Sequence, residues 1–156
     1  MTSLTLVRKI KARPSVVFEA LTTPEGVVSW WGPDDGPVLL AKMSPRVGGR
    51  YRVRFRKLDG SEHEATGEYL EFVPNERLVM SWEWAEGGDP EEAGKVSRLE
   101  FHLKPIDSGT ELTLTHAQLN NEASRKSHEW GWAGALDKLD RHIRPELPDE
   151  TVGRRR

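Results

Sequence analysis

Apolar and polar residues alternate along several stretches of the chain, with the period of two that is typical of half-buried β-strands. The clearest case is residues 50–56, where Tyr51, Val53 and Phe55 alternate with arginines. Similar patterns occur at residues 3–11, 78–84, 99–103 and 112–115. Residues 38–42 and 62–73, which lie next to turns, are also expected to form strands. Turn residues separate the later segments, so the pattern predicts six to seven antiparallel strands joined largely by hairpins.

Two short helices are predicted directly after the first strand. Pro14-Ser15 can open one helix over residues 15–21. Thr23-Pro24-Glu25 combines a capping threonine, a proline at the first helical position and an acid in the first turn. This second helix should end near Trp30-Trp31-Gly32.

The last part of the chain predicts one long helix. At about 100° per residue, one stripe of this helix collects apolar residues and a histidine, namely His128, Trp132, Leu136, Leu139 and Ile143. Trp130 falls on the opposite side. The order of elements predicts an α+β fold in which a curved antiparallel sheet wraps around this helix. One helix does not easily fill the concavity of such a sheet, so we expect an apolar cavity between them.

Composition narrows the classes of protein. The 156 residues suit one domain, with 36% hydrophobic and 31% charged residues, as in water-soluble folds. A net charge of −2 argues against nucleic acid as a partner, and no apolar run is long enough for membrane insertion. Cysteine is absent, which excludes disulfides and fits a cytoplasmic protein. We expect a domain over residues 1–144 and a disordered tail over 145–156.

Six tryptophans are unusual for this length, and they come as three close pairs. Period and helical phase place several aromatic and apolar side chains on the inner side, where they form the core or line the cavity. The predicted ligand-binding residues are Trp31, Tyr51, Val53, Phe55, Met80, Trp82, Phe101, Leu114, His116, His128, Trp132 and Leu136. Trp31, Trp82 and Trp132 are favoured as residues that face the cavity.

His116 and His128 are the candidate catalytic residues, because both are predicted to point inward and histidine titrates near neutral pH. Structural roles in the core are the alternative for each. His63, His102 and His142 have no clear inward assignment. No spacing of histidines and carboxylates predicts a metal site, and no motif predicts a cofactor.

The direction of the glutamates on residues 62–73 depends on the length of the preceding turn. A two-residue turn at Asp59-Gly60 would point Glu64 and Glu68 inward, where they would be candidate acids or bases. A bulge or an odd-length loop would instead bring Ala65, Gly67 and Tyr69 inside. Burial of two unpaired carboxylates is costly, so we favour the second arrangement.

Two further groups are candidates for contacts outside the cavity. Trp130 is predicted to face outward and is the candidate anchor for a protein partner. Its alternative role is packing against a loop or a short helix. The stripe formed by Arg50, Arg52, Arg54 and Arg56 is interpreted as a solvated strand face paired with neighbouring acids, and Glu71 should pair with Arg77.

Several motifs occur in the order found in one known family. They are residues 14–25 (PSVVFEALTTPE), Trp30-Trp31-Gly32, Arg46 to Tyr51, Gly67 to Glu71, Pro74 to Val79, and Gly131-Trp132. Over residues 4–143 the chain resembles the START-like (SRPBCC, birch-pollen-allergen-type) superfamily, and within it the homologues of the activator of the Hsp90 ATPase. The resemblance implies a helix-grip fold. It implies less about activity, because members of this superfamily bind lipids or polyketides, act as cyclases, or assist chaperones.

The sequence favours a protein that binds a hydrophobic or aromatic small molecule, lipid-like or polyketide-like, in the cavity. One alternative, suggested by the family name, is a chaperone-accessory or stress-response interaction domain. Its partner would be a chaperone, and self-association is the other partner that we consider. This chain has no room for the separate N-terminal domain of the eukaryotic activators. A second alternative is a cyclase- or hydrolase-type enzyme that uses His116, His128 or a glutamate. The sequence leaves catalysis open and favours a non-enzyme.

Overall fold

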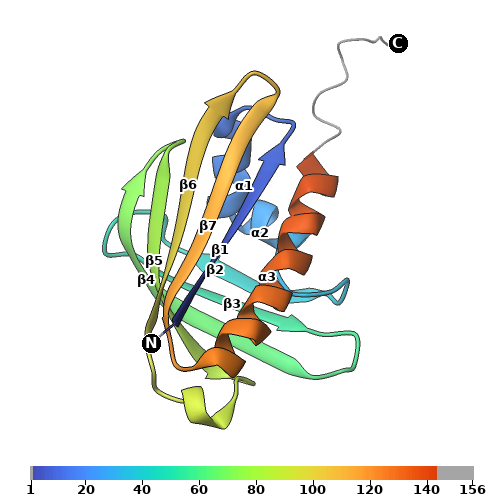
Figure 1. The fold of residues 1–156 in the computed structure, drawn as a ribbon. Helices are drawn as coiled ribbons and strands as arrows, with labels where there is room; N and C mark the ends of the chain where they lie inside the picture. Colours follow the sequence, from blue (N-terminus) through green and yellow to red (C-terminus); the bar gives the residue numbers. More distant parts are fainter. Residues whose placement is uncertain (1, 144–156) are drawn as a thin grey trace.

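The computed structural model describes residues 2–143, so the predicted tail at 145–156 lies outside the described residues. The fold is α+β, with seven strands and three α-helices (Figure 1). In chain order the elements are β1 (Thr2–Ile10), α1 (Pro14–Thr22), α2 (Pro24–Trp30), β2 (Val38–Met43), β3 (Arg50–Arg56), β4 (Glu62–Val73), β5 (Arg77–Glu86), the 3₁₀ helix η1 (Pro90–Glu92), β6 (Ser97–Ile106), β7 (Gly109–Leu119) and α3 (Glu122–Ile143).

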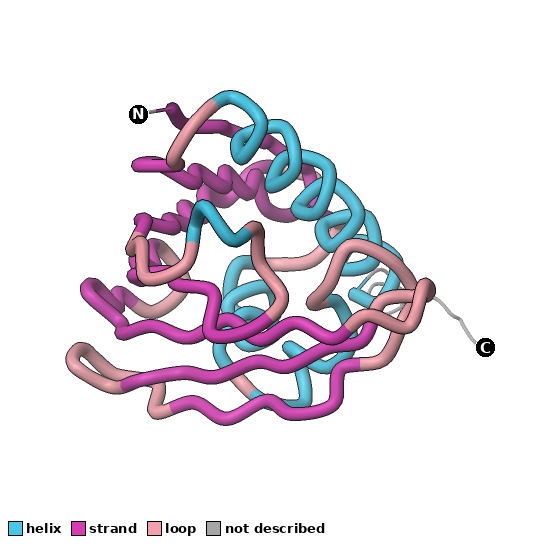
Figure 2. Tube along the Cα trace, turned by 90° about the horizontal axis from the view of Figure 1, so that it is seen from below, coloured by secondary structure: helices cyan, strands magenta, loops and turns pink. Residues whose placement is uncertain are grey.

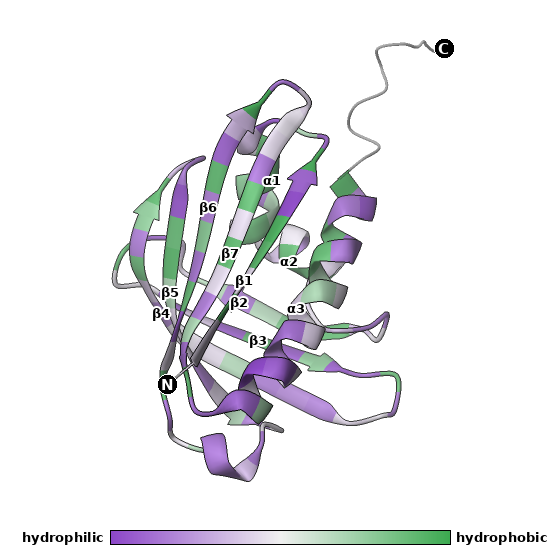
Figure 3. Ribbon diagram, viewed as in Figure 1, coloured by the Kyte–Doolittle hydropathy of each residue, from purple (hydrophilic) through white to green (hydrophobic). Residues whose placement is uncertain are grey.

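The seven strands form one antiparallel sheet in the order β1-β7-β6-β5-β4-β3-β2. The sheet is strongly curved, and α3 crosses its open side (Figure 2). Apolar and polar bands alternate along the strands (Figure 3), as the period of two predicted. The helix-grip arrangement and the two short helices after β1 confirm the predicted fold class.

The start of α2 is fixed by the predicted cap. The Thr23 hydroxyl accepts a hydrogen bond from the amide of Gly26 at 3.0 Å, with Pro24 at the first helical position. At the other end, the indole Nε1 of Trp30 donates to the carbonyl oxygen of Ala20 in α1 at 2.8 Å. These contacts hold α1 and α2 together and fix where the chain leaves α2 at Trp31.

The strand pairing settles the direction of the β4 glutamates. Arg56 pairs with Glu62, which leaves a five-residue connection, and Val53 lies opposite Ala65. Ala65, Gly67 and Tyr69 are buried, so the favoured odd-length arrangement is confirmed.

Glutamates accordingly line the outer face of the sheet beside the arginine stripe. Arg52 Nε donates to Glu64 at 2.9 Å, and Arg54 bridges Glu62 and Glu86, each at 2.7 Å. The arginine stripe is therefore a paired strand face, as interpreted. The predicted pair of Glu71 and Arg77 also forms, at 2.6 Å.

The predicted inner stripe of α3 is buried in full, from His128 to Ile143. Lys138 is also buried, which the sequence did not predict. Its Nζ donates to the carbonyl oxygens of Trp31, at 3.0 Å, and Asp34. Burial lowers the pKa of Lys138, while Asp35 and Asp34 act in the opposite direction. These hydrogen bonds connect the loop after α2 to α3.

Among the residues from 2 to 143, no helix combines the length and apolarity that a membrane crossing requires.

Candidate functional site

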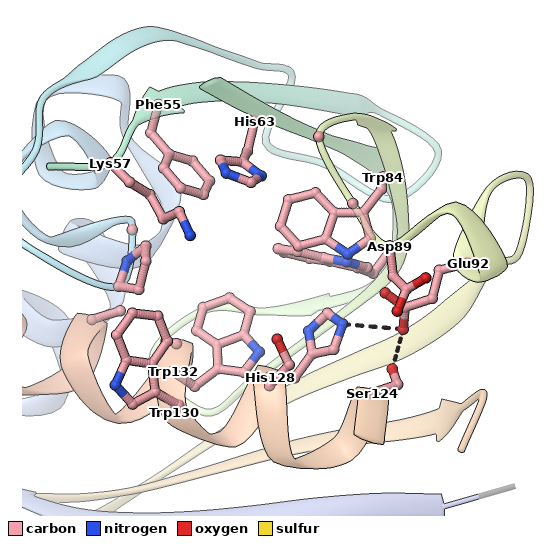
Figure 4. A pocket seen from close by; sticks show the side chains of 18 of the residues that line it. Phe55, Lys57, His63, Trp84, Asp89, Glu92, Ser124, His128, Trp130 and Trp132 are labelled. Carbon is pink, nitrogen blue, oxygen red and sulfur yellow. Dashed lines mark hydrogen bonds and ion pairs between the residues drawn. The ribbon is translucent and has the colours of Figure 1, made fainter. Parts of the chain in front are cut away.

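A cavity of about 160 Å³ lies between the first half of α3 and the sheet (Figure 4). The segments around it are the loop after α2, the ends of β3, β4 and β5, and the loop that carries η1. Its lining consists of Trp31, Gly32, Pro33, Phe55, Lys57, His63, Trp82, Trp84, Gly87, Gly88, Asp89, Glu92, Ala123, Ser124, Ser127, His128, Trp130, Gly131, Trp132 and Ala135. Most of the lining surface is apolar, and six large aromatic side chains contribute to it, as is usual for small-molecule sites.

Five of the predicted ligand-binding residues lie in this lining: Trp31, Phe55, Trp82, His128 and Trp132. The other seven are buried in the core and line neither this cavity nor its neighbour: Tyr51, Val53, Met80, Phe101, Leu114, His116 and Leu136. The alternation identified the inner face of each strand correctly. It could not tell which part of that face meets the cavity and which part meets packed side chains.

Several lining residues were not predicted as site residues. His63 lies opposite Phe55 across β3 and β4, and the two rings stack with centroids 5.2 Å apart. The favoured strand arrangement already implied an inward His63, because it shares its face with Ala65. Trp84 continues the inward alternation of Trp82. Lys57 and Glu92 come from connections between strands, where no periodic pattern reveals direction.

Trp130 is both exposed to solvent and part of the cavity lining. It is 61% exposed, in line with the predicted outward direction, yet it also lines the cavity. The ammonium Nζ of Lys57 lies 6.0 Å from the centroid of its ring, within the range of a cation–π contact. Trp130 and Lys57 thus lie on the solvent side of the cavity.

Trp82 lies at the centre of the aromatic wall. Its ring stacks on Trp31 with centroids 5.6 Å apart and planes 18° from parallel. Trp84 and Trp132 each meet it at 5.3 Å in edge-to-face geometry. Such geometries are the favoured ones for pairs of aromatic rings. The inner wall of the cavity is therefore made of closely packed indoles.

His116 is the inner end of a hydrogen-bonded chain. Trp132 Nε1 donates to His116 Nδ1 at 3.0 Å, and His116 Nε2 lies 2.8 Å from the hydroxyl of Ser97. Because the indole can only donate, Nδ1 is the acceptor and Nε2 carries the proton. Burial, and to a lesser extent His128, holds the pKa of His116 well below its usual range. A neutral histidine with both nitrogens engaged has a structural role.

His128 faces the cavity and pairs with a carboxylate. Its Nε2 lies 3.6 Å from Glu92 Oε2, and the same oxygen accepts a hydrogen bond from the Ser124 hydroxyl (Figure 4). Burial lowers the pKa of His128, and Glu92 opposes that shift. The His116 and His128 rings lie 4.7 Å apart in edge-to-face contact. Of the two candidate catalytic histidines, only His128 could therefore reach a bound molecule.

A second cavity of about 330 Å³ adjoins the first. Trp82, Trp84, Glu92 and His128 line both cavities. The remaining lining comes from the start of β6 and the end of β7, namely Lys95, Val96, Ser97, Gln118, Leu119 and Asn120. Over the described part of the chain, no three or more histidine, aspartate or glutamate side chains gather in a way that could hold a metal ion.

The curved sheet, the long helix across it and the aromatic cavity between them define a START-like helix-grip domain. The family model for Activator of Hsp90 ATPase homolog 1-like proteins matches residues 11–144. The chain belongs to this family, and the resemblance seen in its motifs is confirmed.

Solved structures agree with this fold. A protein from Chromobacterium violaceum has a TM-score of 0.81 at 23% identity, and the match covers 93% of this chain and 99% of that one. The AHSA1 protein of Silicibacter pomeroyi gives 0.80 at 23% identity, with the same coverage. A protein from Nitrosomonas europaea gives 0.75 at 26% identity, covering 92% of this chain and 95% of that one. No match was found among curated proteins.

Proposed function

We propose that the protein binds a hydrophobic or aromatic small molecule in the cavity beneath the first half of α3. The observation that carries this proposal is the aromatic wall around a cavity of about 160 Å³ that is open to solvent on one side. Small-molecule sites are concave and mostly apolar, with a small number of polar groups. This cavity is lined by five tryptophans and opens to solvent, which fits such a site.

The polar groups of the site favour binding over catalysis. His116 is neutral and engaged on both nitrogens, and Glu64 lies on the outer face with Arg52. Of the proposed acid–base groups, only His128 remains at the cavity, and it is paired with Glu92. These features support a binder whose few polar groups orient the ligand.

Two exposed neighbours on α3 allow a matched test. Ser127 lines the cavity, whereas Lys126 does not. We expect Ser127→Trp to fill the entrance and abolish binding, and Lys126→Trp to bind as the wild type does. Isothermal titration calorimetry and native mass spectrometry, against a library of lipids and aromatic compounds, measure this directly. Failure of every compound to bind the wild type, or equal binding by both variants, contradicts the proposal.

A further inference from the structure

The charged side chains around the aromatic cavity are distributed unevenly. Among the described residues that line it, Lys57 is the only lysine or arginine. Figure 4 shows Lys57 at one end of the cavity, beside Phe55, and Asp89 and Glu92 at the other end. The cavity therefore has a positive end and a negative end.

The carboxylates at the negative end already have partners in the protein. Glu92 accepts a hydrogen bond from the Ser124 hydroxyl, and its Oε2 lies 3.6 Å from His128 Nε2. Asp89 accepts a hydrogen bond from the amide of Glu91 at 2.9 Å and so caps η1. Because two carboxylates lie here, this end of the cavity disfavours a bound anion.

Lys57 at the positive end is only weakly engaged. Its Nζ lies 3.8 Å from Asp59 Oδ2 and 6.0 Å from the centroid of the Trp130 ring, and it donates no hydrogen bond to another described residue. Asp59 is largely exposed, and exposed ion pairs contribute little. By contrast, Lys95 at the second cavity donates to Asn120 at 2.8 Å. The three N–H donors of the Lys57 ammonium remain available to a ligand.

The charge of Lys57 acts within the cavity as well as towards solvent. Its side chain is 26% exposed, so most of it is shielded from water. Burial, and next the positive charge of Lys57, lower the pKa of the neighbouring His63, which is therefore neutral at pH 7. An anion beside a partly shielded ammonium is attracted more strongly than it would be in bulk water.

We infer that the ligand is an amphipathic carboxylic acid, whose carboxylate binds the Lys57 ammonium while its apolar body lies against the indoles. This inference rests on the proposed function and specifies the chemistry of the same site. One ammonium balances the single charge of a carboxylate, whereas a phosphate monoester carries a charge of about −2. The open side of the cavity leaves the carboxylate partly hydrated and sets no limit on the length of the apolar body. Lys57 is then the residue that determines specificity for the anion.

Pairs of probe molecules with nearly equal shape test the inference. 2-Naphthoate and 2-acetylnaphthalene share a ring system and a carbonyl group, but only the first is charged; decanoate and 2-undecanone form the matching aliphatic pair. We expect the wild type to bind the acid of a pair about threefold to tenfold more tightly than the ketone at neutral pH and low salt.

Three variants assign the preference to one side chain. In Lys57→Met, which keeps the length of the side chain but not its charge, the ratio of the two dissociation constants should fall towards one. Lys57→Arg should keep the preference for the acid. Lys126→Met is the control, because it removes an exposed lysine of α3 that does not line the cavity, and it should keep the wild-type ratio.

A further measurement does not depend on the folding of any variant. In the wild type, an increase from about 50 mM to about 500 mM NaCl should reduce the preference for the acid, since salt screens a partly exposed charge pair. Equal affinities for acid and ketone, or a preference that persists in Lys57→Met, contradict the inference and leave the proposed function standing. Binding of neutral library compounds alone has the same meaning. No binding of any compound removes the proposed function as well.

Discussion

At the scale of single residues, a histidine that is buried and neutral makes the stability of the fold depend on pH. His116 is fully buried between Trp132 and Ser97, and its pKa is held well below the usual value near 6.5. In the unfolded chain the same side chain takes up a proton below about pH 6.5. The unfolded state then binds more protons than the folded state, so stability is present above this pH and falls as the pH decreases.

We therefore expect the free energy of unfolding to decrease between pH 7 and pH 5, by up to about 1.4 kcal/mol per pH unit for this one group. His116→Gln removes the titrating group and should flatten that slope. Urea unfolding at a series of pH values measures the effect. Ser97→Ala is the control: it lowers stability at every pH but keeps the slope. An unchanged slope in His116→Gln contradicts the assignment.

At the scale of elements, α3 depends on one close approach to the loop after α2. A Cβ atom added at Gly134 would lie 2.0 Å from the carbonyl oxygen of Pro33, a backbone atom that cannot easily move. At Gly131, one turn earlier, the added Cβ would meet only Pro33 Cβ, at 3.8 Å. The same substitution at these two positions should therefore have opposite effects.

We expect Gly134→Ala to destabilise the protein by about 1–3 kcal/mol, because the helix must separate from the loop. Gly131→Ala should stabilise it by about 0.5–1 kcal/mol, since alanine is the better helix former and the site has room. Thermal and chemical unfolding of the two variants provide the comparison. Destabilisation of both by the same amount would show that the close approach at Gly134 is not the cause.

The elements themselves could be predicted from the sequence, whereas several site residues could not. Period, caps and turns gave the strands, the two short helices and the buried stripe of α3, and the cost of buried carboxylates gave the direction of Glu64. The pairing of Glu92 with His128 and of Lys138 with Trp31 joins segments far apart in the chain. Local patterns carry no information about such contacts, so the buried Lys138 and the half-buried Glu92 were missed.

At the scale of the whole molecule, Trp130 separates the binding proposal from the chaperone-accessory alternative. Because its ring is 61% exposed, Trp130→Ala should change the free energy of unfolding by no more than about 0.5 kcal/mol. If the outer face of α3 engages a chaperone or a second copy, this variant should lose that interaction while the fold persists. The chaperone's ATPase rate and the protein's sedimentation measure both cases. The alternative is contradicted if the chaperone's ATPase rate is the same with the wild type, with the variant and with no added protein, and if the wild type and the variant sediment alike.

The order of the strands also affects how the chain folds while it is made. β1 pairs only with β7 in the described sheet, and partners such as Leu6 and Leu114 are about 100 residues apart in the sequence. At a synthesis rate of about 5–20 residues per second, β1 waits several seconds on the ribosome before its partner emerges. During that time the hairpins from β2 to β6 can form locally. The pairing of β1 with β7 is therefore the last step that completes the sheet.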